Sequence, residues 1–192
     1  MLKNFTDETS RSTNEGLLLQ SILFGDLKLP NRVVMAPLTR MRTPTPGAIP
    51  NELMREYYGQ RASAGLIISE GTFVSDQARG WFAAPGIYTE EQRKGWQTIT
   101  DSVHRAGGHM IVQLWHQGSI SSRRLVGHGR SPWGPSAVNP GQLVHTGYGM
   151  TEMTHVPKAM TLEDIRQTIA EFRHASKVAR DAGFDGVQIQ GG

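Results

Sequence analysis

Four apolar runs in the sequence each end in side chains that suit contacts with a planar redox ring. Thr39 follows the first run, and its hydroxyl can donate a hydrogen bond to a ring carbonyl. Gly71 follows the second run and leaves room for a flat ring against the backbone. In the third run, Gln113 presents a donor and an acceptor, which match the amide edge of a flavin, and Trp115 adds a flat wall. The fourth run ends near Gln190, whose amide can donate a hydrogen bond.

Each of these residues also has an ordinary structural explanation. A threonine after a strand caps a helix more often than it binds a ligand, and a tryptophan more often packs in a core. Their chemistry therefore depends on whether the fold brings the four run ends together.

The composition excludes several other classes of function. The 192 residues contain no cysteine, which rules out disulfides, thiolate catalysis and cysteine zinc sites. The 7 histidines show no metal-binding spacing, so we expect no metal site. With 20 Lys and Arg against 17 Asp and Glu, and no block of like charge, nucleic-acid binding is not predicted. The acidic start Met1–Glu8 and the lack of a long apolar run predict a cytoplasmic protein with no membrane anchor.

The elements that must position these side chains alternate between strand and helix. The four runs are continuously apolar, as parallel strands covered on both faces are, and span 33–39, 66–72, 110–116 and 187–192. Three segments between them begin at a cap and end at a glycine, at 51–65, 89–107 and 161–183. The predicted buried helix positions are Leu53, Met54, Tyr57, Tyr58, Trp96, Ile99, Val103, Ile165, Ile169, Phe172 and Ala179. This alternation predicts an α/β fold, a partial TIM (β/α) barrel of about four parallel units, in a single domain over 1–192.

Two further segments lie outside these units. Residues 21–31 have the pattern of a short hairpin, which we expect to plug the amino-terminal end of the barrel. Residues 117–158, rich in Gly, Pro and Ser, form a long excursion after the third strand. We interpret it as a lid that contains a hairpin, and a floppy surface insertion is the alternative.

Six stretches, taken together, carry a family resemblance. They are NRVVMAPLTRMR at 31–42, EYYGQRA at 56–62, SEGT at 69–72, APGIY at 84–88, QLWH at 113–116 and GFDGV at 183–187. They resemble the Old Yellow Enzyme family of FMN-dependent NADH/NADPH oxidoreductases, or ene-reductases, over nearly the whole chain. By that resemblance, Ala36, Pro37, Leu38 and Thr39 line the flavin, Gly71 approaches it through the backbone and Gln113 binds its pyrimidine edge. Trp115 would border the substrate cavity.

The sequence departs from the family pattern at three points. Ser119 replaces the arginine of Trp-His-x-Gly-Arg, and Gln188-Ile189-Gln190 replaces Glu-Ile-His. Gln190 therefore takes the catalytic histidine position, where an amide can donate a hydrogen bond but polarises a carbonyl less than imidazole does. The third departure is that nothing follows Gly192, although the family draws its proton-donating tyrosine and its phosphate loops from later strands.

Three hypotheses follow from the sequence. The first is an FMN-dependent oxidoreductase that uses NADPH or NADH to reduce enones, and that needs a complementary half-barrel chain or a second copy of itself. The second is a redox-inactive relative that acts as a binding or scaffold subunit or in a non-redox reaction. The third is a truncated gene product with no settled fold.

Overall fold

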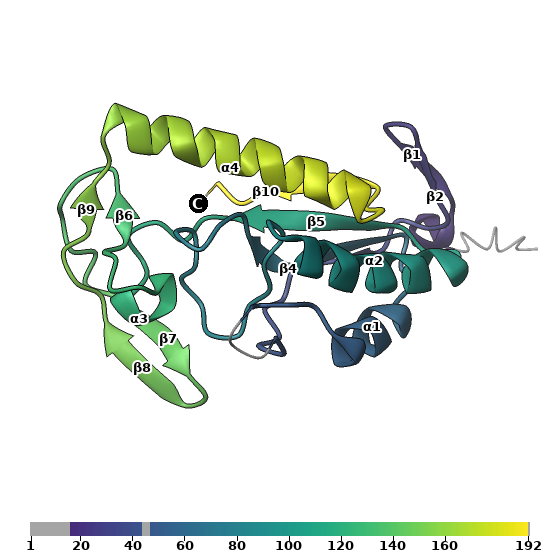
Figure 1. The fold of residues 1–192 in the computed structure, drawn as a ribbon. Helices are drawn as coiled ribbons and strands as arrows, with labels where there is room; N and C mark the ends of the chain where they lie inside the picture. The colour runs from purple at the N-terminus through teal and green to yellow at the C-terminus, as the bar shows by residue number, and fades with distance from the viewer. Residues whose placement is uncertain (1–15, 44–46, 192) are drawn as a thin grey trace, which may run out of the picture.

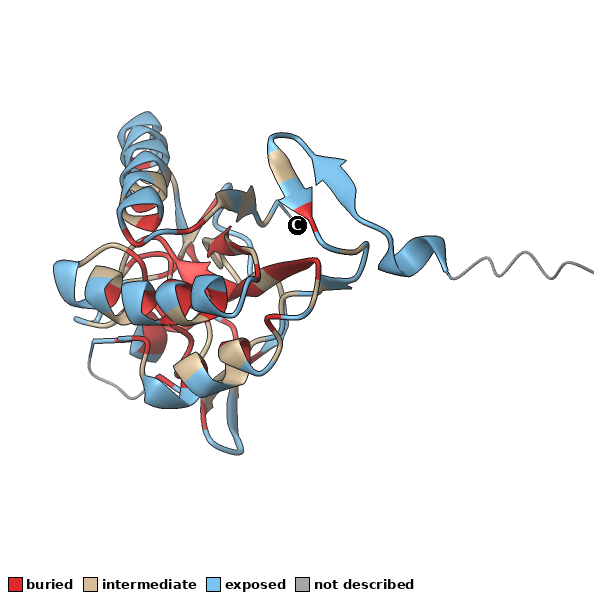
Figure 2. Cartoon of the chain, turned by 90° about the vertical axis from the view of Figure 1, so that its right-hand side faces the viewer, coloured by how far each residue is buried: buried red, intermediate tan, exposed pale blue. Residues whose placement is uncertain are grey.

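A four-stranded parallel sheet forms the centre of the computed structural model, which describes residues 16–43 and 47–191 (Figure 1). In spatial order the strands are β10 (Gly186–Ile189), β5 (Met110–Trp115), β4 (Leu66–Phe73) and β3 (Val34–Met35). The connecting helices are α1 (Glu52–Gly59), α2 (Glu90–Arg105) and α4 (Leu162–Asp181), and they lie on one side of the sheet (Figures 1 and 2). The predicted order of parallel β/α units is confirmed. The acidic start Met1–Glu8 lies outside the described residues.

The helices begin where the sequence places their caps. The side chain of Asn51 accepts a hydrogen bond from the backbone N–H of Met54. Thr89 and Thr161 each head a capping box, in which the side chain of the third helical residue returns to the cap backbone. The starts of all three helices follow from local chemistry.

The buried helix faces agree best with the prediction where a helix has a neighbour on each side, although Met54 and Tyr58 of α1 and Ala179 of α4 are also buried as predicted. α2 lies between α1 and α4, and its Trp96, Ile99 and Val103 are fully buried as predicted. The predicted burial of Leu53, Ile165 and Ile169 is wrong, since they are 61%, 42% and 54% exposed. They lie on α1 and α4, the two end helices of the row. Each of these helices has α2 on one side only, so part of its apolar surface packs against neither the sheet nor α2.

The two faces of the sheet differ in burial. Met110, Val112 and Leu114 of β5 are 0% exposed and belong to the main hydrophobic cluster. Ile111 and Trp115, at alternate positions, are partly exposed. The apolar run of β5 therefore does not reflect cover on both faces, because the helices cover one face only, whereas β4 is buried at all but one of its positions (Figure 2).

The hairpin and the excursion occupy opposite ends of the sheet (Figure 1). β1 (Ile22–Phe24) and β2 (Leu27–Leu29) pair through a turn at Gly25, which has a φ of 59°, after a 3-10 turn η1 (Leu17–Leu19). The predicted hairpin is confirmed, and Leu23 and Phe24 in it are 71% and 58% exposed.

The excursion at 117–158 contains regular secondary structure, which argues against a flexible surface insertion. It contains α3 (Arg123–Val126), β6 (Trp133–Gly134), β7 (Leu143–Gly147), β8 (Met150–Met153) and β9 (Lys158–Ala159). β7 and β8 form the expected hairpin. The backbone N–H of Phe82 donates to the carbonyl of His145 (3.0 Å), and the Tyr148 hydroxyl donates to the carbonyl of Met41 (3.1 Å). The excursion thus lies against the segments that follow β3 and β4, where a lid would lie.

Within the described ranges, no helix combines the length and apolar content that a membrane crossing needs.

Candidate functional site

The strand register places three of the polar or small residues in one row. Gly71 of β4 pairs with Gln113 of β5, and Gln113 pairs with Gln188 of β10. The Nε2 of Gln113 donates to the Oε1 of Gln188 at 2.8 Å. Because an amide that donates through nitrogen to one neighbour has its oxygen fixed on the other side, this bond sets the orientation of the Gln113 amide.

An irregularity in β4 produces this register. Ile68 pairs with Ile111 while Gly71 pairs with Gln113, so β4 carries one residue more than β5 over this stretch, which is a β-bulge. The Ser69 hydroxyl accepts a hydrogen bond from the backbone N–H of Gln113 at 3.0 Å and fills the gap in the ladder. Bulges of this kind often re-aim side chains beside active sites.

Gly71 makes room for an indole ring of the protein itself. A Cβ built at Gly71 would lie 2.2 Å from Cε3 of Trp115. Trp115 in turn stacks on Phe73, with ring centroids 5.2 Å apart and planes inclined by 19°. The structure thus shows that the absence of a side chain at Gly71 leaves space for Trp115. The expected role of Gly71, a close approach of its backbone to a flavin, stays a prediction.

The segment after β3 is held against the carboxyl end of β4. The backbone N–H of Arg40 donates to Oε2 of Glu70 at 3.0 Å, which brings Thr39 close to the residue that precedes Gly71. Pro37 and Thr39 are half-buried, whereas Ala36 and Leu38 are exposed. The Thr39 hydroxyl makes no hydrogen bond with any residue that the structure describes.

Gln190 continues the row at the end of β10. Its backbone N–H donates to the carbonyl of Leu114 at 3.0 Å, next to Trp115. The structure therefore gathers Thr39, Gly71, Gln113, Trp115 and Gln190 at the carboxyl ends of four adjacent parallel strands, where β/α barrels carry their active sites.

Two titratable groups near the row are perturbed by burial. Burial raises the pKa of Glu70 to about 7, against the smaller opposing effects of hydrogen bonds from Arg40 and Tyr58. Burial lowers the pKa of His116, whose Nδ1 accepts a hydrogen bond from the backbone N–H of Gly118 (3.0 Å). The imidazole is thus neutral near pH 7, with its proton on Nε2.

Sequence reasoning did not single out Glu70 or Tyr58 as members of the site. Both lie in the stretches that carry the family resemblance, SEGT and EYYGQRA, so a signal was present. Gln188 was noted only as a departure from the family pattern, and its contact with Gln113 depends on a register that the bulge sets.

The donor set fits the pyrimidine half of a flavin. The only hydrogen bond of the Gln113 side chain among the described residues is its Nε2 donation to Gln188, so Oε1 remains for the N3–H of a flavin. The Thr39 hydroxyl is also available to a ring carbonyl. For the phosphate, barrels commonly use loops after strands seven and eight, and the central sheet of the described chain has four strands.

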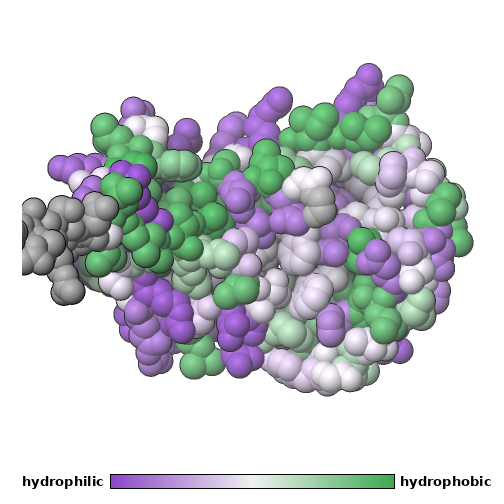
Figure 3. All heavy atoms as spheres, turned by 180° about the vertical axis from the view of Figure 1, so that it is seen from behind, coloured by the Kyte–Doolittle hydropathy of each residue, from purple (hydrophilic) through white to green (hydrophobic). Residues whose placement is uncertain are grey.

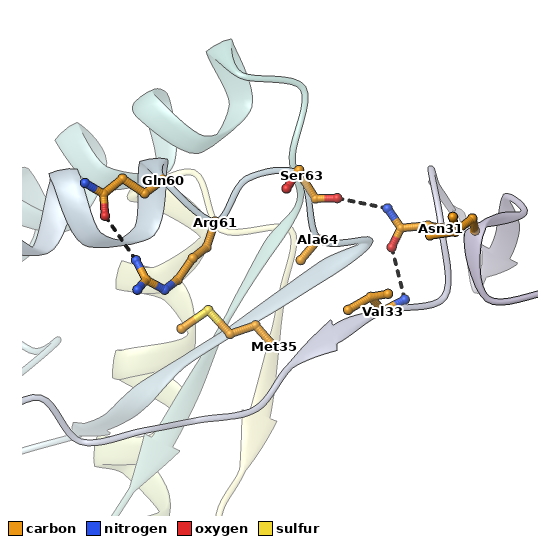
Figure 4. Close-up of a pocket in the computed structure, with 8 residues that line it drawn as sticks. Asn31, Val33, Met35, Gln60, Arg61, Ser63 and Ala64 are labelled. Carbon is orange, nitrogen blue, oxygen red and sulfur yellow. Dashed lines mark hydrogen bonds between the residues drawn. The ribbon is translucent and has the colours of Figure 1, made fainter.

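A separate cavity lies away from this row. It has a volume of about 520 Å³ and is found beside β3 and the amino-terminal end of β4, with Met35, Arg61 and Ala64 in its lining (Figure 4). Asn31 closes one side, donating through Nδ2 to the Ser63 carbonyl at 2.9 Å (Figure 4). Among the described residues β3 pairs only with β4, so the cavity borders a strand edge that no described strand covers. No group of three or more His, Asp or Glu side chains in the described part could hold a metal ion.

Comparison with known proteins gives consistent matches. The profile of the NADH:flavin oxidoreductase / NADH oxidase family matches residues 18–192. Flavin oxidoreductase hxnT of Emericella nidulans is 40% identical over 179 residues, which are 91% of this chain and 45% of that protein.

Solved structures agree. Morphinone reductase in complex with tetrahydroNAD superposes with a TM-score of 0.83 at 42% identity, over 90% of this chain and 48% of that chain. The old yellow enzyme homologue from Zymomonas mobilis superposes with a TM-score of 0.85 at 44% identity, over 91% of this chain and 48% of that one. These matches confirm the predicted partial TIM barrel. The chain spans about half the length of these relatives.

Proposed function

The chain belongs to the NADH:flavin oxidoreductase / NADH oxidase family, and from that premise we propose that it supplies the amino-terminal half of an FMN-dependent barrel that reduces activated alkenes such as enones. The observation that carries this proposal is the row of Gly71, Gln113 and Gln188, in which the Gln113 amide is oriented with its oxygen left to accept. The cofactor class expected from the sequence, a flavin with a nicotinamide reductant, agrees with the family description.

Each residue of the row has a distinct part in the proposed reaction. Gln113 would hold the pyrimidine edge of FMN, and Thr39 would donate to a ring carbonyl. Trp115 would limit the substrate cavity, and Gln190 would donate to the carbonyl oxygen of the enone and stabilise the charge that develops there. FMN, when bound, would take a hydride from NADH or NADPH and pass it to the alkene.

We further propose that a complementary half-barrel chain completes the site. In the part of the chain that the structure describes, β10 and β3 are each paired on one side only, and Val187 and Ile189 of β10 are 42% and 65% exposed. Ile165 and Ile169 of α4 add to the exposed apolar surface. Unpaired edges with exposed apolar side chains favour the addition of further strands.

The unpaired β3 edge supports the same assembly. The 520 Å³ cavity there lies where a further β/α unit would pack (Figure 4). The apolar side chains of η1 and the first hairpin gather on the face seen in Figure 3, and Leu19 among them is 71% exposed. Two copies of this chain would place two first hairpins at the same end of one barrel. A second copy is therefore a less favoured partner than a complementary half-barrel chain.

FMN titration of the purified chain tests the proposal, alone and together with the carboxyl-terminal half of a family relative. We expect the flavin spectrum and NADPH consumption with cyclohexenone to appear in the complemented sample, with a native mass equal to the sum of the two chains. In that sample Gln113→Leu should weaken FMN binding about tenfold or more, because it removes hydrogen bonds to the ring. Gln97→Leu, on the exposed face of α2, is the matched control. Complementation without any FMN binding would refute the proposal.

A second candidate is a redox-inactive binding subunit, and the neutral pair Gln188 and Gln190 favours it. The variant Gln190→His, assayed in the complemented sample, distinguishes the two. Bound FMN with no enone reduction in either form would favour the binding subunit, whereas reduction by the wild type would exclude it.

A further inference from the structure

Glu70 is a buried carboxylate that the proposed function does not use. It is 1% exposed and lies in the bulge of β4, directly before Gly71. Its Oε2 accepts the hydrogen bond from the backbone N–H of Arg40 (3.0 Å), and its Oε1 accepts from the Tyr58 hydroxyl (3.2 Å). The backbone N–H of Glu70 donates to the same hydroxyl at 2.9 Å. One residue therefore joins the bulge, α1 and the segment that follows β3.

We propose that Glu70 is a positioning residue of the flavin site, whose carboxylate fixes the segment 36–40 against β4 and so sets where the Thr39 hydroxyl lies. The inference rests on the proposed function for the role of Thr39 toward FMN. The hydrogen bond from the Arg40 backbone N–H to Glu70 forms within this chain, and its strength can be measured without FMN.

Burying a charged side chain costs more free energy than burying a neutral one, so a carboxylate is unfavourable as a purely structural link at this position. A glutamine could still accept from Arg40 through its oxygen without the desolvation penalty of a charge, although its nitrogen would then replace the acceptor of the Tyr58 hydroxyl proton. That penalty is what raises the pKa of Glu70 to about 7. Buried groups with such shifts are found preferentially at functional sites.

The groups that act on the carboxylate come from two elements. α1 contributes Tyr58, and the segment after β3 contributes Arg40 and Arg42, whose charges lower the pKa of Glu70 against the larger effect of burial. β5, the neighbouring strand, has no titratable side chain. The ionised form offers Arg40 a charge-assisted hydrogen bond and the protonated form a weaker neutral one. The hold on the segment should therefore tighten as pH rises through neutrality.

Amide NMR of the full chain without FMN, between about pH 5.5 and 8.5, tests this directly. We expect the Arg40 amide proton to titrate with a midpoint near neutral pH and to exchange about tenfold more slowly, after correction for intrinsic rates, when Glu70 is ionised. Glu70→Gln keeps the hydrogen bond and should abolish the titration. Glu70→Met keeps the volume and should leave the amide exchanging fast at every pH. The amide of Ala106, which donates to the carbonyl of Ser102, is the control and should be unaffected.

Two results would overturn the inference: an Arg40 titration that persists in Glu70→Gln, or Arg40 exchange that is unchanged in Glu70→Met. If Glu70→Met does not fold, the Glu70→Gln comparison decides alone. FMN titration of the complemented sample at both ends of the pH range then separates the two proposals. A chain that gives the expected Arg40 titration and binds no FMN retains Glu70 as the positioning residue of this segment and refutes the proposed function instead.

Discussion

Replacement of Gly71 by alanine should strain the centre of the site. The added Cβ would lie 2.2, 2.8 and 2.9 Å from three ring carbons of Trp115, where carbon atoms normally approach to about 3.5 Å. The indole must therefore move by about 1 Å or more, and it can do so only by disturbing its stack on Phe73. Overpacking of this kind costs about 1–3 kcal/mol. For a chain of this size the melting temperature should fall by about 3–10 °C.

Thermal unfolding followed by far-ultraviolet circular dichroism measures this cost, and the near-ultraviolet signal reports the indole stack. Gly191→Ala is the matched control, because a Cβ there meets no atom of the described residues within 4 Å, and it should leave the melting temperature unchanged. The decisive comparison adds Trp115→Leu, since a smaller side chain should relieve most of the cost of Gly71→Ala. If Gly71→Ala costs the same with Trp115 and with Leu at 115, the contact does not explain the need for glycine.

Three further predictions concern charge, orientation and assembly. The folded state retains a proton on Glu70 up to a pKa of about 7, so the fold loses stability as pH rises from the ordinary pKa of 4.5 to about 7. The free energy of unfolding in urea should therefore be lower at pH 8 than at pH 5.5, by about 2 kcal/mol more in the wild type than in Glu70→Gln. An equal difference in the two proteins would contradict the assignment. Gln188→Leu leaves Nε2 of Gln113 unpaired and should weaken FMN binding about tenfold in the complemented sample, while Gln188→Glu, which still accepts the bond, should restore it. Ile165→Lys with Ile169→Lys should change the stability of the isolated chain by no more than about 0.5 kcal/mol, since both side chains are exposed, but should abolish complementation as measured by native mass.

The sequence predicts best what local chemistry determines. The caps of α1, α2 and α4 depend on residues within a few positions of each other, and all three are where the pattern places them. The buried face of α2 was also predictable, because its apolar stripe meets neighbours along its whole length. An apolar stripe shows which face a helix can bury but not whether a partner is there, and for this reason the prediction was wrong at Leu53, Ile165 and Ile169.

The sequence predicts which side chains lie at the strand ends, but not how the strands align them. Periodicity places Gln113 and Gly71 at strand ends, but the bulge shifts β4 by one residue, and only that shift sets Gly71 beside Gln113. A one-residue change of register in a sheet reverses which face each side chain occupies. The packing of Trp115 over Gly71 joins residues 44 positions apart, and no local pattern encodes it.

The bulge connects these observations, because each of its residues has a different structural role in the site. The Ser69 hydroxyl bonds to the backbone of Gln113, Gly71 leaves space for Trp115, and Glu70 bonds to α1 and to the segment that bears Thr39. A regular strand would place the Glu70 side chain and its backbone differently and would lose this set of contacts together. A buried carboxylate that lowers stability at neutral pH is difficult to explain by folding alone, since a glutamine would keep the bond from Arg40 without the desolvation penalty of a charge. Function at the carboxyl edge of the sheet is the simpler explanation of why an ionisable group is there.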